Sequence, residues 1–284
     1  MSTIQTITHK VHRFYEHVSF PGYDDIDDAD TLITKAKANL YVSLLTKQLP
    51  TTAKVIEIGC GTGQLTNLLA LGDRQVVGAD ISHHSLSLAH KFKQQNLINT
   101  ANFIQMDIFH PCFPKQVFDI AISNGVLHHT PNPQLAFKNM VALVKPKGLI
   151  ILGLYNSYGR LLTNIRHQIY RNFGRIDALD YYLRQRNLPQ SKKEIWFQDQ
   201  YQNPHESQHT VDEILGWFKQ EGIEYLNSVP KISLFSQLNR QERLFHHHRQ
   251  GSRLEHLLSQ LIWVITQERE GGLFILIGRK SDKD

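Results

Sequence analysis

Cysteine is scarce in this 284-residue chain, which contains only Cys60 and Cys112. Two cysteines are too few for a disulfide framework or a cysteine-based zinc site, so we expect both to be reduced thiols. The chain also lacks any run of about 18 apolar residues, and its first ten residues lack the apolar core of a signal peptide. We therefore expect a cytoplasmic protein with no membrane span and no bound metal.

Charge is present in ordinary amount but unevenly placed. The net charge is +5, and charged residues make up 20% of the chain against 41% hydrophobic residues, as in a globular protein. Eight Arg or Lys and two Asp lie between Arg160 and Lys193, whereas five Asp crowd residues 24–30. A basic segment fits an anionic partner such as RNA, but a solvated helix face is the commoner explanation. A nucleic-acid partner is therefore left open without being favoured.

The most informative stretch is residues 55–65, which read VIEIGCGTGQL. An apolar run, alternate glycines and a helical pattern predict a strand, a tight loop and a helix. Three close glycines let a ligand lie against the main chain, and the amides at the start of the helix point into the same space. Gln64 stands where a dinucleotide fingerprint requires its third glycine. The Glu57 carboxylate would repel a pyrophosphate but suits a ligand that carries an amino group.

Polar residues also end the next three predicted strands, which span residues 75–80, 102–106 and 118–123. Asp80 follows the last loop glycine by 17 residues, close to the spacing at which an acidic residue binds ribose hydroxyls. Asp107 follows the third strand, and Asn124 follows the fourth. In doubly wound sheets ligands bind at the carboxyl ends of the strands, so we expect these side chains to share one site.

These motifs together resemble class I S-adenosylmethionine (SAM)-dependent methyltransferases. The glycine loop resembles the family's motif I, and residues 124–129, NGVLHH, resemble its motif IV as found in the small-molecule, quinone-biosynthesis-like group. The resemblance covers residues 50–155 and the final strand. It implies SAM as methyl donor, with the glycines along the methionine portion, Asp80 on the ribose and Asp107 near the adenine. The implied donor-binding set is Glu57, Gly59, Gly61, Gly63, Asp80, Ile81, Asp107, Ile108 and Asn124.

Helical and strand patterns alternate along the chain, which predicts an open parallel α/β sheet. Helices are expected over residues 4–17, 32–49 and 133–144, a fifth strand over 149–155, a sixth over 223–229 and a last one over 273–277. The resemblance implies a Rossmann-like, doubly wound, seven-stranded sheet whose last strand is antiparallel and lies between strands five and six.

Four regions follow from this reading. Residues 1–50 form N-terminal helices that act as a lid, and residues 51–155 form the SAM-binding core. Residues 156–209 are too long for a plain connection and are interpreted as an inserted helical cap. Residues 210–284 complete the core, with a second insertion at 230–270 that contains an amphipathic stretch from Leu254 to Val264.

Two histidines follow the fourth strand and are the candidates for a catalytic base. His128 and His129 titrate near neutrality, which suits proton removal from an oxygen or nitrogen acceptor. The alternative is that one of them packs or caps the helix that begins near Pro131. Acceptor contacts are expected from the lid and cap, at Tyr23, Tyr155, Tyr201, His205 and Glu206, with Asp199 and Gln200 on the same cap segment. A polar loop that merely anchors the cap is the competing interpretation.

Residues 205–209, HESQH, match the zinc-protease pattern, which requires both histidines on one helix face. Thr210 and Glu213 form a capping-box signal that would start the helix after His209, although Asn203-Pro204 followed by Glu206 also resembles a helix start. We favour the first reading and expect no zinc. The Asn-Pro-Pro-Tyr motif used for nucleobase or glutamine amino groups is absent from the sequence, and Cys60 and Cys112 are misplaced for pyrimidine carbon methylation.

The sequence thus indicates a SAM-dependent methyltransferase that acts on a small or medium-sized acceptor bound under a helical cap. One alternative is methylation of RNA or another macromolecule through the basic segment 160–193. A second alternative is a SAM-binding protein without transfer activity. The insertions lie outside the resemblance, so the donor is better specified than the acceptor.

Overall fold

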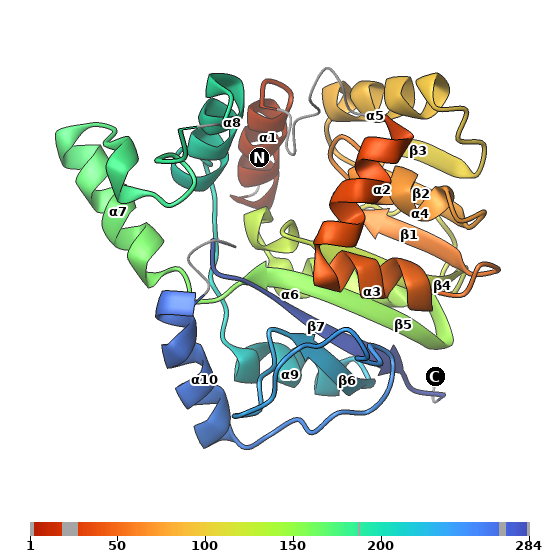
Figure 1. Cartoon of the computed structure of the whole chain (residues 1–284). Coiled ribbons are helices and arrows are strands. Elements are labelled where there is room, and N and C mark those ends of the chain that lie inside the picture. The colour runs from red at the N-terminus through yellow and green to blue at the C-terminus, as the bar shows by residue number, and fades with distance from the viewer. Residues whose placement is uncertain (1–2, 19–27, 187, 267–270, 283–284) are drawn as a thin grey trace.

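A computed structural model of the chain describes residues 3–18, 28–186, 188–266 and 271–282, whose strands form a sheet in the order β3-β2-β1-β4-β5-β7-β6 (Figure 1). Strands β1 to β5 are parallel, and β7 is antiparallel to both β5 and β6. The doubly wound sheet with its antiparallel last strand between strands five and six is thereby confirmed. The strands are β1 (Lys54–Ile58), β2 (Gln75–Asp80), β3 (Ala101–Gln105), β4 (Phe118–Asn124), β5 (Val144–Tyr155), β6 (Ile223–Val229) and β7 (Leu273–Lys280).

Helices cover both faces of this sheet. One core contains apolar side chains of α2 to α5, and the other contains those of α6, α9 and α10. Alternate residues of a strand serve opposite faces, so Val55 belongs to the first core and Ile56 to the second. The helices are α1 (Thr3–Tyr15), α2 (Ala29–Ala38), α3 (Leu40–Gln48), α4 (Gln64–Ala70), α5 (His83–Gln95), η1 (Leu127–His129), α6 (Pro133–Ala142), α7 (Leu161–Phe173), η2 (Asp177–Leu179), α8 (Gln190–Tyr201), α9 (Val211–Gln220) and α10 (Arg253–Thr266).

Two predicted elements differ from the observed ones. The helix expected over residues 32–49 is broken at Asn39, which ends α2 and caps α3 by accepting a hydrogen bond from Val42 N at 3.1 Å. The fifth strand begins at Val144 rather than at Leu149, because Val144 pairs with Phe118 before an irregularity restores the regular register. Both differences depend on local side-chain bonding or pairing with distant residues, which the apolar periodicity does not report.

The chain order reverses between β1 and β4, which are neighbours although β2 and β3 lie between them in sequence. Ligands in open α/β sheets bind beyond the carboxyl ends of the strands at such a point. Helices α1 and α8 lie side by side near this end of the sheet (Figure 1), and Tyr15 of α1 hydrogen-bonds to Asp199 of α8. The N-terminal helix and the 156–209 segment therefore meet above the switch point.

Residues 156–209 contain α7, η2 and α8, which have a small apolar cluster of their own. Tyr170, Leu183, Phe197 and Tyr201 are buried together, with Trp196 packed against them.

Within the described part of the chain, every helix falls short of the length and apolar content needed to cross a bilayer.

Candidate functional site

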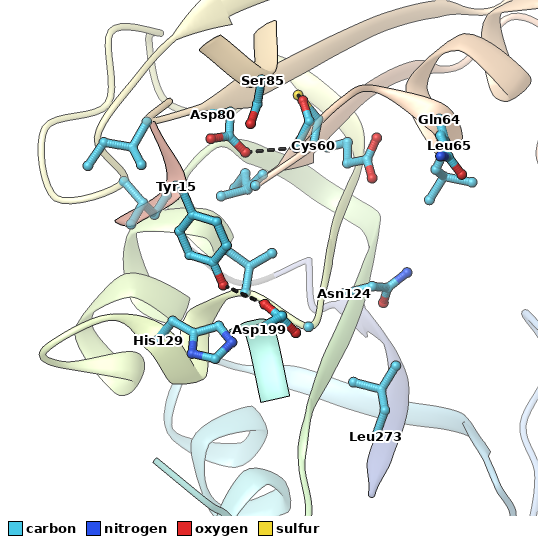
Figure 2. Close-up of a pocket in the computed structure, with 18 of the residues that line it drawn as sticks. Tyr15, Cys60, Gln64, Leu65, Asp80, Ser85, Asn124, His129, Asp199 and Leu273 are labelled. Carbon is cyan, nitrogen blue, oxygen red and sulfur yellow. Dashed lines mark hydrogen bonds between the residues drawn. The ribbon is translucent and has the colours of Figure 1, made fainter. Parts of the chain in front are cut away.

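A cavity of about 530 Å³ lies at the carboxyl ends of β1, β2 and β4. Its walls come from the glycine loop, from the residues that follow β2 and β4, and from α1, α2 and α8. Figure 2 shows Asp80, Cys60 and Ser85 at one end of this space, and Tyr15, Asp199 and His129 together at another. The cavity therefore has two chemically different parts.

The glycine loop approaches its neighbours too closely for side chains. Gly59 has φ +72°, and a Cβ there would lie 2.3 Å from Val126 Cγ1. Gly63 has φ +76°, and a Cβ there would lie 2.7 Å from the Ala89 Cβ. The loop therefore packs main chain against Val126 and α5, which keeps its backbone exposed to the cavity at Gly59 and Gly61.

Asp80 is fixed in place by the backbone. Its Oδ2 accepts a hydrogen bond from Gly61 N at 2.8 Å, and its Oδ1 accepts one from Ser82 N at 2.8 Å. Each carboxylate oxygen has a second lone pair, so the group can still accept from a bound diol. Burial raises the pKa of Asp80, while these amide hydrogen bonds act in the opposite direction.

Glu57 is a buried carboxyl group that also lines the cavity. Thr66 Oγ1 donates a hydrogen bond to its Oε2 at 2.5 Å. Burial raises the pKa of Glu57 to about 8, and the nearby charge of Asp80 contributes in the same direction. A cationic ligand group beside Glu57 would stabilise the ionised form and reverse this shift.

Asn124 presents an unsatisfied acceptor at the end of β4. Its Oδ1 is buried without a hydrogen-bond partner among the described residues, whereas its Nδ2 lies 3.5 Å from the Tyr41 hydroxyl. Buried polar atoms are almost always hydrogen-bonded in folded proteins. Because Asn124 lines the cavity, a ligand N–H or O–H donor is the natural partner for this oxygen.

The acidic residue after β3 completes the first part of the cavity. Asp107 lines the wall and accepts a hydrogen bond from Phe109 N at 2.9 Å. Ile81 and Ile108 line the same wall, as does Met106. Apolar side chains next to a carboxylate suit a flat, partly polar ring.

Asp199 of α8 stands at the centre of the second part. Its Oδ1 accepts a hydrogen bond from the Tyr15 hydroxyl at 3.1 Å, and its Oδ2 accepts one from Gln200 Nε2 at 3.0 Å. Gln200 Nε2 also donates to the Tyr155 hydroxyl at 2.7 Å, and Asn203 Nδ2 donates to the Tyr15 hydroxyl at 2.8 Å. Burial raises the pKa of Asp199. The cluster places a buried carboxyl group between two phenols on the cavity wall.

Tyr15 touches both parts of the cavity. Its hydroxyl binds Asp199, while its main-chain oxygen accepts a hydrogen bond from Ser82 Oγ at 3.0 Å. Ser82 is also the residue whose amide binds Asp80. The end of α1 is thereby tied to the loop after β2 and to α8.

The two histidines form a directional hydrogen-bonded chain. Tyr155 N donates to His128 Nδ1 at 3.3 Å, so the proton of neutral His128 lies on Nε2 and points at His129 Nε2, 3.1 Å away. His129 Nδ1 then donates to the His205 main-chain oxygen at 2.9 Å. Burial lowers the pKa of both histidines, which agrees with two neutral rings. Both nitrogens of His129 are thus engaged within the protein.

Arg160 lies behind this cluster and is almost completely buried. Its guanidinium binds the Glu206 carboxylate at 3.1 and 2.5 Å, and it also donates to Gln200 Oε1 and to the Gly271 main-chain oxygen at 3.2 Å. The same group lies 4.1 Å from the centre of the Tyr155 ring. Arg160 therefore joins the end of β5, the end of α8 and the start of β7.

Most residues expected from the sequence come together in this cavity. The lining includes Glu57, Gly59, Gly61, Asp80, Ile81, Asp107, Ile108, Asn124, His129, Tyr155, Asp199 and Gln200. Gly63 and His128 lie just behind the lining, where Gly63 begins α4 and His128 stacks on Tyr155. Tyr23 lies outside the described residues.

Three acceptor candidates do not reach the cavity wall. Tyr201 donates to Asp180 Oδ2 at 2.6 Å within the apolar cluster of the 156–209 segment. His205 meets the site only through its main-chain oxygen, and Glu206 pairs with Arg160. The side chains of Tyr201 and Glu206 thus stabilise the 156–209 segment.

Tyr15 and Trp196 line the cavity, although neither was among the site residues expected from the sequence. Tyr15 follows the apolar pattern of its helix, and its partner Asp199 is 184 residues away. The aromatic residue at the end of a helix next to a polar loop was the only local signal.

The zinc-like sequence is not helical in the structure. Thr210 caps α9 through a complete capping box with Glu213, so the helix begins after His209, as predicted. His209 binds Glu213 at 2.9 Å and Ser207 at 2.9 Å. His205 and His209 therefore do not share a helix face.

Comparisons with known proteins agree with this geometry. A family model described as a methyltransferase domain matches residues 51–222, which is more than half of the chain. The ubiquinone biosynthesis O-methyltransferase of Coxiella burnetii is 34% identical over 102 residues, covering 36% of this chain and 43% of that protein. The protein of the same description from Haemophilus ducreyi is 28% identical over 108 residues, covering 36% of this chain and 45% of its own length. The chain matches less than half the length of these curated relatives.

The fold is similar to that of magnesium protoporphyrin IX methyltransferase from Synechocystis PCC 6803, solved with bound SAH. The TM-score is 0.52 at 16% sequence identity, and the alignment covers 98% of this chain and 96% of that one.

Proposed function

The chain belongs to the class I SAM-dependent methyltransferase family, and we propose that it transfers a methyl group from SAM to a small or medium-sized acceptor held between α1 and α8. One observation carries the proposal: a single cavity joins an acidic wall at the strand ends to a separate cluster of Asp199, Tyr15 and Tyr155. The first part suits the donor, and the second suits an acceptor.

The residues of the first part fit SAM or its demethylated product, S-adenosylhomocysteine (SAH). Asp80 has free lone pairs for two ribose hydroxyls, and the side chains around Asp107 suit the adenine. Glu57 suits the amino group, and the unsatisfied Oδ1 of Asn124 supplies an acceptor for a ligand donor. A Cβ at Gly59 would strike Val126, so the loop keeps main chain against the ligand space.

When bound, SAM supplies an activated methyl group on its sulfonium. The chain then has to hold the acceptor in line with this group and to keep water out. The walls of the second part supply Tyr15, Tyr155 and Trp196 for that enclosure. In this arrangement the N-terminal helix α1 acts as a lid, and the 156–209 segment acts as a cap.

We assign proton handling at the acceptor to Asp199 with His129 beside it. The Asp199 carboxylate can bind an acceptor hydroxyl and take its proton, because its two oxygens have lone pairs beyond those used by Tyr15 and Gln200. His129 would accept a proton only if His128 rotated away from its Nε2. His128 therefore positions His129, and the pair keeps the wall next to Asp199 neutral. A hydroxyl acceptor also agrees with the O-methyltransferase description of the relatives.

The ion pairs of the basic segment favour an RNA acceptor less than the charge composition of the sequence does. Within the basic segment, Arg160 pairs with Glu206, Arg166 lies 4.0 Å from Asp180, and Arg175 pairs with Asp177 and Glu194. These cations serve internal ion pairs, which leaves a smaller basic surface for phosphate contacts.

Two measurements test the proposal. Calorimetry should detect binding of SAM and SAH, and Asp80→Ala should weaken both, whereas an absence of binding would contradict the donor assignment. Labelled SAM incubated with a cell extract should place the label in the small-molecule fraction. Label in RNA would favour the macromolecular alternative, and binding without label in any fraction would favour a SAM-binding protein.

The role of Asp199 is tested with the same assay. Asp199→Asn should retain donor binding but lose methyl transfer, because the amide cannot take the acceptor's proton. Asp282→Asn, at an exposed carboxylate on the opposite end of the sheet, is the control. Equal transfer by the Asp199→Asn variant and the wild type would contradict the assignment.

A further inference from the structure

Helix α10 buries mostly polar side chains and exposes mostly aliphatic ones. Its buried positions are Trp263, which packs in the core beside Phe274, and His256, Ser259 and Gln260, which have polar partners. His256 binds Asp212 at 2.9 Å and the Gln250 main-chain oxygen at 2.8 Å. Its exposed positions carry aliphatic side chains at Leu254, Leu257, Leu258, Leu261, Ile262 and Ile265, with exposed fractions between 39% and 78%. The helix thus buries one tryptophan and three polar side chains, and it leaves its aliphatic side uncovered by described residues.

The spacing of these side chains is that of a helix-pairing seam. Positions 254, 257, 258, 261, 262 and 265 follow the intervals of three and four residues that place side chains on one stripe. Coiled-coil seams use the same intervals. The stripe contains no charged residue between Arg253 and the helix end, so its full length is available for packing against another helix.

Helix α7 adds two exposed aliphatic side chains, Leu161 at 47% and Ile165 at 49%. The segment that leads into α7 contacts α10, since Asn156 Nδ2 donates a hydrogen bond to Gln260 Oε1 at 2.8 Å. Figure 1 shows α7 and α10 on the side of the molecule opposite α5 and β3. We call these eight aliphatic residues of α10 and α7 the outer stripe.

The outer stripe is large for a surface that stays in water. Its exposed fractions add up to the equivalent of about four whole side chains, on the order of 700 Å², near the ~800 Å² per partner of a standard interface. Soluble monomers rarely expose contiguous apolar patches of this size.

The charges around the stripe distinguish a protein partner from a lipid surface. Interfacial membrane helices carry Lys or Arg along their polar face, but α10 has Glu255 and His256 there, and its one Arg or Lys is Arg253 at the first position. On α7, Arg166 is buried 4.0 Å from Asp180, which leaves Arg171 as its exposed arginine. An arginine at a helix N-terminus is unfavourable beside the positive end of its own dipole. In an antiparallel pair of α10 helices it would lie beside the negative C-terminal end of the other helix. We propose that the outer stripe is the two-fold interface of a homodimer, with α10 packed antiparallel against α10 of a second copy.

The dimer goes beyond methyl transfer but connects to the acceptor site through the buried side of α10. Gln260 accepts hydrogen bonds from Asn156 Nδ2 at 2.8 Å and from Val211 N at 2.9 Å. Asn156 in turn accepts from the amides of Tyr158 and Gly159, which lead into Arg160. The interface would therefore lie directly behind the segment that carries Arg160 and α7.

Sedimentation velocity and light scattering on the full chain test the proposal. The wild type should have twice the chain mass, and Leu261→Glu, at the centre of the stripe, should raise the dimer dissociation constant at least about 30-fold. Leu97→Glu is the matched control, because Leu97 is 83% exposed and follows α5, far from the stripe. It should leave the mass unchanged. Unchanged circular dichroism and SAH binding would show that Leu261→Glu folds.

Three results would overturn the proposal. One is a wild type that remains monomeric at every concentration tested. Another is a dimer that Leu261→Glu leaves intact. The third is a monomeric wild type that binds vesicles containing anionic phosphatidylserine, with Leu261→Glu abolishing that binding and Leu97→Glu retaining it, which would assign the stripe to a lipid surface.

Discussion

Replacing Glu57 by Gln should stabilise the unliganded protein while weakening its hold on the donor. Burial raises the pKa of Glu57 from 4.5 to about 8. The folded state therefore binds a proton that the unfolded state has released between these two pH values, and stability falls as pH rises through this window. Glutamine does not titrate, so the variant should escape the loss.

The size of the effect follows from the shift. Each pH unit inside the window lowers the free energy of unfolding of the wild type by about 1.4 kcal/mol. The loss amounts to on the order of 3 kcal/mol at pH 7. Below pH 4.5 the folded and the unfolded states both hold the proton, so this loss of stability disappears. The gap in unfolding free energy between Glu57→Gln and the wild type should therefore widen from pH 5 to pH 8. Urea unfolding followed by circular dichroism across this range measures the gap.

Donor binding should change in the opposite sense. Calorimetry should show that Glu57→Gln binds SAH at least about tenfold more weakly, because the ligand's amino group loses an ionised partner. 5′-Methylthioadenosine, which lacks the amino-acid portion, is the control ligand and should bind both proteins equally. A stability gap that stays constant from pH 5 to pH 8 would refute the reasoning about burial, whatever the binding results.

Two further substitutions test other parts of the site. Gly59→Ala should lower the free energy of unfolding by about 1–3 kcal/mol and weaken SAH binding, since its Cβ would lie 2.3 Å from Val126 Cγ1. Gly125→Ala has a similar positive φ of +76° but open space around the new Cβ, so urea unfolding should show a smaller loss, and equal losses would contradict the packing argument. Arg160→Met should lower the free energy of unfolding by about 3–5 kcal/mol, because it leaves Glu206 without its buried cation. Adding Glu206→Gln should recover part of that loss in urea unfolding, and a purely additive double variant would contradict the pairing.

The donor part of the cavity could be predicted because its residues are local signals. Glu57, Asp80, Asp107 and Asn124 each stand at the end of a strand that the apolar pattern marks, and parallel strands bring such ends together. Their shared location at one edge of the sheet can therefore be predicted without knowing how side chains pack.

The second part of the cavity, around Asp199, could not be predicted in the same way. Tyr15 and Asp199 meet across 184 positions of sequence, and no periodicity connects them. Tyr201 and Asp199 lie two positions apart on α8, yet one packs into the 156–209 cluster while the other reaches the cavity. Amphipathicity likewise predicted the helix over residues 254–264 but did not say which face is buried. In α10, His256 and Gln260 point inward beside Trp263 because Asn156, Val211 and Asp212 bind them there.

The position of Tyr15 determines how the two proposed sites would affect each other. One residue spans both halves of the cavity, with its main-chain oxygen on Ser82 and its hydroxyl on Asp199. Arg160 secures the opposite wall to Gln200, Glu206 and Gly271. An acceptor that enters past α1 must separate Tyr15 from Asp199 while Ser82 still holds the backbone beside Asp80. The proposed donor and acceptor sites are thereby linked through a single helix end, so a ligand that displaced Tyr15 at one site would change the geometry of the other.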